Sequence, residues 1–122
     1  MAKKILIVDD DPDILVIATV RLKYMGYEII SAIDAENALI VLKTEIPDLI
    51  ILDRLLPKMQ GEDLCKKLKS DDKYKNIPII MFTALVDDVA KVVKEIGADD
   101  YITKPFEPKD LISKVQTYAG DP

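Results

Sequence analysis

The sequence predicts an α/β fold in which five parallel strands alternate with five helices. Two observations support this. Short aliphatic runs such as 5–8 and 49–52 contain no polar residue, which is typical of strands buried on both faces of a parallel sheet. Segments with helical apolar spacing and capping residues separate those runs. Because alternating strands and helices of this length form right-handed crossovers, we expect a three-layer sandwich with one central sheet.

Caps, glycines and prolines set the boundaries of these elements. Asp11 suits the N-cap of the first helix, Pro12 suits its first position, and Gly26 ends it. Pro47 limits the second helix because a proline disfavours helical backbone at the residue before it. Gly97 ends the fourth helix in the same way as Gly26 ends the first. In chain order we expect a strand at 4–8, a helix at 12–25, a strand at 28–31, a helix from about 34 to before 47, a strand at 49–52, a helix at 62–69, a strand at 78–82, a helix at 87–96, a strand at 100–103 and a helix at 108–118.

Length and composition exclude several classes of protein. A chain of 122 residues suits one domain with one core, so 1–122 is expected to be a single domain. No apolar stretch approaches the roughly 20 residues of a membrane span, and the N-terminus lacks a signal peptide, so we expect no membrane contact and a cytoplasmic location. Cys65 is the single cysteine, which excludes an internal disulfide. The absence of histidine excludes imidazole-based zinc sites and catalysis, and the net charge of −5 argues against direct nucleic-acid binding.

Polar residues suited to phosphate or metal chemistry stand at the ends of four predicted strands. In chain order they are Asp9, Asp10 and Asp11, then Asp53, then Thr83, then Lys104. Because ligands of an open parallel sheet bind outside the carboxyl ends of its strands, these side chains should converge on one pocket. Carboxylates so close together cannot all stay ionised without a cation, and oxygen ligands without imidazole or thiolate suit Mg²⁺.

These motifs resemble the receiver domain of the two-component response regulators, over residues 5–115. The stretches that carry the resemblance are 5–11, 48–53 with 56–57 and Gly61, 82–84, and 97–106. The resemblance implies a flavodoxin-like (βα)5 sandwich with the sheet order 2-1-3-4-5. It also implies a regulatory phosphoacceptor that catalyses only its own phosphorylation and dephosphorylation, rather than an enzyme.

The resemblance further implies roles for the carboxylates. Asp53 would be the nucleophile that takes a phosphoryl group from the phosphohistidine of a sensor histidine kinase or a histidine phosphotransfer protein. A carboxylate needs no general base for this attack, which fits the absence of histidine. Asp10 would bind Mg²⁺ directly, Asp9 mostly through water, and the Leu55 backbone carbonyl would complete the protein ligands. Mn²⁺ is a possible substitute.

The remaining site residues would bind the phosphoryl group and transmit the signal. Lys104 would pair with Asp53 before the reaction and with phosphoryl oxygens after it, in an orientation set by a cis bond to Pro105. Thr83 would donate its hydroxyl to the phosphate. Tyr101 would be the aromatic switch that moves inward with Thr83 and alters the output surface formed by 87–96, 100–103 and 108–118.

Arg54, Leu55 and Leu85 depart from what is common in the family. Arg54 follows the nucleophile where an apolar residue is more frequent, and could line the rim of the site or recruit a kinase carboxylate; the sequence leaves both open. Leu55 and Leu85 each lie two residues past a site residue. Aliphatic side chains cannot orient a water molecule, so they predict slow hydrolysis of the phosphorylated state.

Other functions fit the sequence less well. A phosphatase of the haloacid dehalogenase type also uses an aspartate nucleophile after a parallel strand, but needs a second aspartate where this chain has Leu55. A flavin mononucleotide binder would meet three aspartates after the first strand, which repel its phosphate. A degenerate receiver is disfavoured because every expected site residue is present.

The output of the domain is less constrained by the sequence. Four charged residues partly match those through which DNA-binding relatives dimerise, namely Asp99, Asp100, Asp110 and Lys114. They allow a phosphorylation-dependent homodimer or docking of a downstream output protein. The sequence does not determine the cognate kinase, or whether the chain is free-standing or part of a longer protein.

Overall fold

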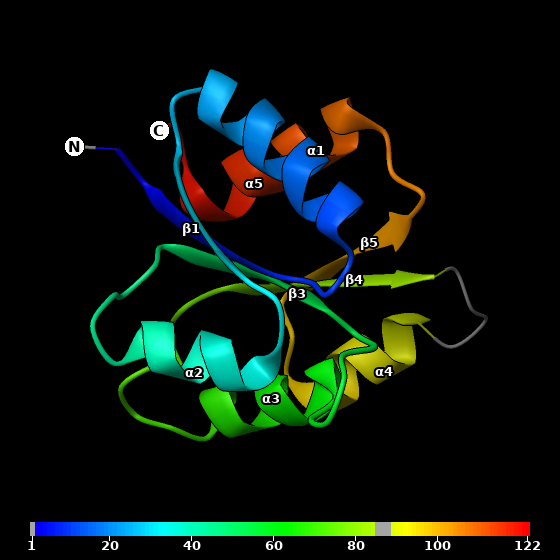
Figure 1. The fold of residues 1–122 in the computed structure, drawn as a ribbon. Helices are drawn as coiled ribbons and strands as arrows, with labels where there is room; N and C mark the ends of the chain where they lie inside the picture. The colour runs from blue at the N-terminus through cyan, green and yellow to red at the C-terminus, as the bar shows by residue number, and fades with distance from the viewer. Residues whose placement is uncertain (1, 85–88) are drawn as a thin grey trace.

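The protein folds as an α/β sandwich around one sheet (Figure 1). The computed structural model describes residues 2–84 and 89–122. In chain order its elements are β1 (Lys4–Val8), α1 (Pro12–Tyr24), β2 (Glu28–Ala32), α2 (Ala35–Leu42), β3 (Leu49–Asp53), α3 (Gly61–Lys69), β4 (Ile79–Ala84), α4 (Val89–Ile96), β5 (Asp100–Lys104) and α5 (Pro108–Ala119).

The sheet has five parallel strands in the order β2-β1-β3-β4-β5, which confirms the predicted fold class and strand order. Helices α1 and α5 cover one face, and α2, α3 and α4 cover the other (Figure 1). Among the helices in the described part of the chain, none is long and apolar enough to cross a membrane.

The strands alternate their side chains between two apolar cores, one on each face. In β1, Ile5 and Ile7 pack toward α1 and α5, whereas Leu6 and Val8 pack toward the helices of the opposite face. All four side chains are fully buried. The unbroken aliphatic sequence of the central strands follows from this two-sided burial. Cys65 lies in the second of these cores, as a buried thiol without a disulfide.

Several boundaries differ from the predicted ones. The strands β2, β3, β4 and β5 each end one or two residues later than predicted, β4 begins one residue later, and helix α3 begins at Gly61. Helix α2 ends at Leu42, well before Pro47, because the backbone N–H groups of Thr44 and Glu45 both turn back to the Val41 carbonyl. The predicted start of the fourth helix at Asp87 lies outside the described residues.

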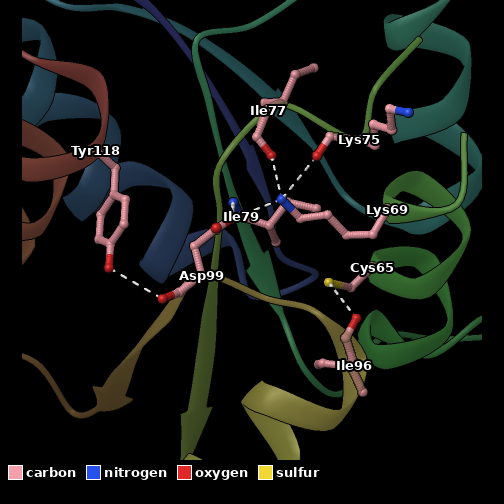
Figure 2. Close-up of polar contacts among 8 residues, drawn as sticks. All are labelled: Cys65, Lys69, Lys75, Ile77, Ile79, Ile96, Asp99 and Tyr118. Carbon is pink, nitrogen blue, oxygen red and sulfur yellow. Dashed lines mark hydrogen bonds and ion pairs between the residues drawn. The ribbon is translucent and has the colours of Figure 1, made fainter. Parts of the chain in front are cut away.

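At the amino ends of β4 and β5, a polar network ties α3 to the sheet (Figure 2). The Lys69 ammonium donates to the Ile77 carbonyl at 2.9 Å and to Asp99 Oδ2 at 2.9 Å. Asp99 Oδ2 also accepts from the Ile79 N–H, and the Tyr118 hydroxyl donates to the Asp99 carbonyl. The carboxylate of Asp99 is therefore used inside the chain. This network anchors one end of the sheet and leaves the carboxyl end for the site.

Candidate functional site

The carboxyl ends of the strands bring the predicted residues to one edge of the sheet. Asp53 is the last residue of β3 and lies beside Phe82 of β4, while Thr83 of β4 lies beside Thr103 of β5. Lys104 follows Thr103 directly, as the last residue of β5. A pocket of about 470 Å³ opens at this edge. Its lining residues are Asp53, Arg54, Leu55, Gln60, Glu62, Thr83, Ala84 and Lys104.

Three carboxylates gather at this edge of the sheet. Asp9, Asp10 and Asp53 each offer a carboxylate oxygen within 4.8 Å of the others. Asp9 and Asp53 are buried, whereas Asp10 is exposed. Asp11 is used differently, because its carboxylate accepts the Asp13 N–H as the N-cap of α1. The cluster offers only carboxylate oxygens as metal ligands, and oxygen ligands are those that Mg²⁺ prefers.

Lys104 bridges two of these carboxylates. Its ammonium lies 2.8 Å from Asp9 Oδ2 and 3.3 Å from Asp53 Oδ1. The sequence predicted a pair with Asp53, and the structure shows a shared contact in which Asp9 is the closer partner. The expected cis bond joins Lys104 to Pro105.

Burial and charge shift the acidity of the site. Burial, reinforced by the charge of Asp9, raises the pKa of the Asp53 carboxyl to about 6, against the opposing effects of Lys104 and of the Leu55 N–H. Burial alone would lower the pKa of the Lys104 ammonium, but its hydrogen bond to Asp9 and the charge of Asp53 outweigh burial and raise it. Without a further cation, the pocket therefore holds more negative charge than Lys104 balances.

Of the two predicted switch residues, Thr83 lines the pocket and Tyr101 lies further back along β5. The buried Thr83 hydroxyl donates to the Ala84 carbonyl at 3.1 Å. Tyr101 is half-buried against the core that includes α4, and the Lys114 ammonium lies 5.9 Å from its ring centre. Leu55 is 70% exposed at the rim, and Leu85 lies outside the described residues. The signalling roles of Thr83 and Tyr101 remain predictions.

Sequence reasoning missed one partner in the pocket. Arg54 Nε donates to Glu62 Oε1 at 2.5 Å, so Glu62 of α3 forms part of the rim. Nothing in the local sequence joins these residues, since Arg54 lies in the loop after β3 and Glu62 lies in α3. A weak signal was available, because an acid directly after Gly61 stands in the first turn of a helix that returns to the end of β3.

Gly61 allows the loop after β3 to close tightly. A Cβ atom at this position would lie 1.9 Å from the Asp53 carbonyl oxygen and 2.9 Å from its carbon. The Gly61 N–H donates to the Arg54 carbonyl at 3.0 Å. Only a glycine permits this approach, because a side chain would displace the backbone that carries Asp53.

Replacing Gly61 by alanine is therefore expected to lower the free energy of unfolding by about 2 kcal/mol, as overpacking does. It should also weaken any response to Mg²⁺, because Asp53 shifts. Urea titrations with and without Mg²⁺ measure both effects. Gly120→Ala is the control, because that position has a φ of 81° but no neighbour within 4 Å of the added atom. It should lose stability and keep its response to Mg²⁺. An unchanged response in Gly61→Ala would contradict the argument.

The comparisons with known proteins agree with this arrangement. A family model described as the response regulator receiver domain matches residues 5–116. The chain belongs to the response regulator receiver family. The receiver domain is 44% identical over 117 residues to the alkaline phosphatase synthesis transcriptional regulatory protein PhoP of Bacillus subtilis, covering 95% of this chain and 48% of that protein. The chain spans about half the length of the curated relatives it matches.

Solved structures share the fold of this receiver domain. A putative response regulator from Chloroflexus aurantiacus superposes with a TM-score of 0.92 at 38% identity, covering 98% of both chains. The receiver domain of a sensor histidine kinase from Pseudomonas aeruginosa superposes with a TM-score of 0.87 at 26% identity, covering 98% of this chain and 99% of that one. That protein holds a magnesium ion in its active site cleft. The comparisons give no support to a dehalogenase-type phosphatase.

Proposed function

We propose that this receiver domain takes a phosphoryl group onto Asp53 from the phosphohistidine of a sensor histidine kinase or a histidine phosphotransfer protein. The observation that carries the proposal is the position of the buried Asp53 carboxylate, which lies in a pocket with one ammonium, from Lys104, and one hydroxyl, from Thr83. The domain would act as a regulatory phosphoacceptor that catalyses only its own phosphorylation and dephosphorylation.

The chemistry needs few protein groups. An Asp53 carboxylate oxygen forms a bond to phosphorus as the bond from phosphorus to the donor nitrogen breaks, and the electron pair leaves with that nitrogen, which is then protonated from solvent. The Lys104 ammonium would leave Asp53 and bind a phosphoryl oxygen. The Thr83 hydroxyl would leave the Ala84 carbonyl and donate to a second phosphoryl oxygen. Positioning and neutralising the phosphoryl oxygens account for most catalysis of this type.

The carboxylate cluster fits Mg²⁺. Asp9 already uses both carboxylate oxygens, since Oδ1 accepts the Asp11 N–H and Oδ2 accepts Lys104. The exposed Asp10 is then the better direct ligand, with Asp9 acting through water, and the Leu55 carbonyl would complete the set. When bound, Mg²⁺ would supply positive charge that neutralises the pocket and the phosphoryl oxygens.

Output would pass through the surface of α4, β5 and α5, with Tyr101 as the switch. Three of the four charged residues expected at a dimer interface are paired within the chain, because Lys114 Nζ lies 2.6 Å from Asp100 Oδ2 and Lys69 pairs with Asp99. A homodimer through these residues would have to break those pairs. The pairing therefore favours docking of a downstream output protein over a homodimer.

We also propose that residues 1–122 form one receiver domain that acts in the cytoplasm and does not bind nucleic acid itself. Its net charge of −5 supports the last point, because phosphate backbones attract basic surfaces. Any DNA binding would belong to a separate output module.

The direct test is the intact mass of the protein after treatment with a small acyl phosphate and Mg²⁺. We expect the mass of one phosphoryl group to be added and then removed by hydroxylamine, which cleaves acyl phosphates. No added mass, under conditions in which a known receiver domain is labelled, would overturn the proposal.

Mg²⁺ is expected to stabilise the folded protein, because it relieves the crowding of negative charge at Asp9, Asp10 and Asp53. Saturating ligand at roughly 100 times its Kd contributes about 2.7 kcal/mol. Asp10→Asn should lose most of this gain. Asp11→Asn is the matched control, because asparagine caps a helix as well as aspartate and Asp11 is not in the cluster. Thermal melting with and without Mg²⁺ tests this; a gain retained in Asp10→Asn would place the metal elsewhere.

A further inference from the structure

Arg54 is held rigidly at the mouth of the pocket. Its backbone N–H donates to the Phe82 carbonyl at 2.9 Å, and its own carbonyl accepts the Gly61 N–H at 3.0 Å. Its side chain is tied at the Nε atom by Glu62. Both side chains are about three-quarters buried, with exposed fractions of 25% and 30%. The backbone and the guanidinium of Arg54 are therefore both held by hydrogen bonds before any ligand binds.

Among residues 2–84 and 89–122, Glu62 is the one side chain that pairs with the guanidinium. A guanidinium has five N–H donors in a planar fork, and Glu62 takes the one on Nε. Within the described residues, Arg54 forms no ion pair with Asp53, whose cationic partner is Lys104. A phosphoryl group on Asp53 would extend from the carboxylate into the same pocket, which Arg54 lines.

Charge makes such a contact favourable. Phosphorylation of Asp53 replaces the single charge of its carboxylate with about two negative charges at neutral pH and presents three acceptor oxygens. The buried Asp9 carboxylate lies beside this group, and the Lys104 ammonium is shared between Asp9 and Asp53. Planar guanidinium groups recognise phosphate oxygens well, and do so best when they are preorganised and partly desolvated.

We propose that Arg54, oriented by Glu62, is a further phosphoryl-binding residue of this receiver domain, so that the transferred group is held by a guanidinium on the side of α3 as well as by Lys104 from β5. This inference rests on the proposed phosphorylation of Asp53 and assigns a second cation to that site. Of the two roles open for Arg54 from sequence, the geometry favours lining the rim of the site over recruitment of a kinase carboxylate, because the guanidinium pairs with Glu62 in the lining of the pocket.

Beryllofluoride provides a probe that does not need the transfer step, because it mimics the phosphoryl group on the acceptor aspartate. We expect Arg54→Leu to weaken Mg²⁺-dependent beryllofluoride binding by about 10-fold, the size of one charge-assisted hydrogen bond. In ¹⁹F spectra of the complex, at least one fluorine resonance should shift. Arg54→Lys, which keeps the charge without the fork, should recover part of the affinity.

Two further variants separate this role from general effects. Arg21→Leu removes the same charge from the exposed surface of α1 and should bind beryllofluoride like the parent protein. Glu62→Gln keeps an acceptor for Arg54 Nε and removes a negative charge from the rim, so it should bind at least as tightly as the parent.

The outcomes distinguish the inference from the proposal on which it rests. Failure of the parent protein to bind beryllofluoride would overturn both. Equal binding by the parent and by Arg54→Leu, with unchanged fluorine resonances, would overturn the role of Arg54 alone. Equal binding combined with slower transfer from a kinase would also overturn it, and would assign Arg54 to the partner interface instead.

Discussion

Replacing Asp53 by asparagine is expected to abolish labelling by a phosphodonor completely, while making the metal-free protein more stable at neutral pH. The first effect follows from the loss of the nucleophile, since an amide oxygen does not attack phosphorus under these conditions. The second follows from the environment of Asp53, which is buried next to Asp9 and only partly balanced by Lys104. The same substitution therefore removes function and relieves an unfavourable charge.

The pH dependence of this effect has a definite sign. The pKa of Asp53 is about 6 in the folded protein and near 3.9 in an unfolded chain. The folded state thus binds the proton more tightly, so the contribution of this group to stability is present at pH 4 and is lost as pH rises through 6. Each pKa unit is worth about 1.4 kcal/mol, and solvent screening reduces the total, so we expect Asp53→Asn to gain about 1 to 2 kcal/mol above pH 7.

Intact mass and urea unfolding between pH 4 and pH 8, without divalent cations, measure the two effects. The stability difference between Asp53→Asn and the parent protein should be near zero at pH 4 and largest above pH 7. Added Mg²⁺ should reduce the difference, because it stabilises the parent more. Labelling of Asp53→Asn at the parent level would place the acceptor elsewhere, and a stability difference independent of pH would contradict the assigned environment of Asp53.

Replacing Lys104 by methionine is expected to slow phosphorylation by about 100-fold or more. Methionine has an unbranched side chain of similar length but no charge, so it removes the ammonium from the developing phosphoryl oxygens. Loss of one preorganised donor of this kind costs about 100- to 1000-fold in rate. Metal-free protein should also lose about 2 kcal/mol of stability at pH 7, because the fully buried Asp9 carboxylate loses its nearest cation. The loss is no larger because solvent partly screens the Lys104 ammonium.

A time course of mass change with a small acyl phosphate gives the rate, and urea unfolding gives the stability. Lys75→Met is the matched control, because Lys75 forms an exposed ion pair with Asp72 far from the pocket and should change neither quantity by much. Mg²⁺ should restore most of the stability lost in Lys104→Met but little of the rate. Parent-like rates in that variant would show that Lys104 does not contact the phosphoryl group.

Local patterns in the sequence were sufficient for the fold. The aliphatic runs that form β1 and β3 are buried on both faces of the sheet, and the cap at Asp11 begins α1 as predicted. These features depend on residues close together in the chain, where periodicity and capping act. Boundaries at the ends of α2 and the strands were less accurate, because turn hydrogen bonds and strand pairing extend or shorten an element by a few residues.

The sequence by itself determined that Asp53, Thr83 and Lys104 meet at the site, because parallel strands deliver their carboxyl ends to one edge. It could not determine how they pair. Lys104 lies closer to Asp9 than to Asp53, across a separation of 95 residues, and Arg54 is bound to an acid on α3 that no local rule connects to it. Such pairings depend on how the loop after β3, helix α3 and the ends of β1, β3 and β5 pack together, and the electrostatic environment depends on the pairings in turn. The partners of Lys104 and Arg54, and the raised pKa of Asp53, were therefore decided only by the tertiary structure.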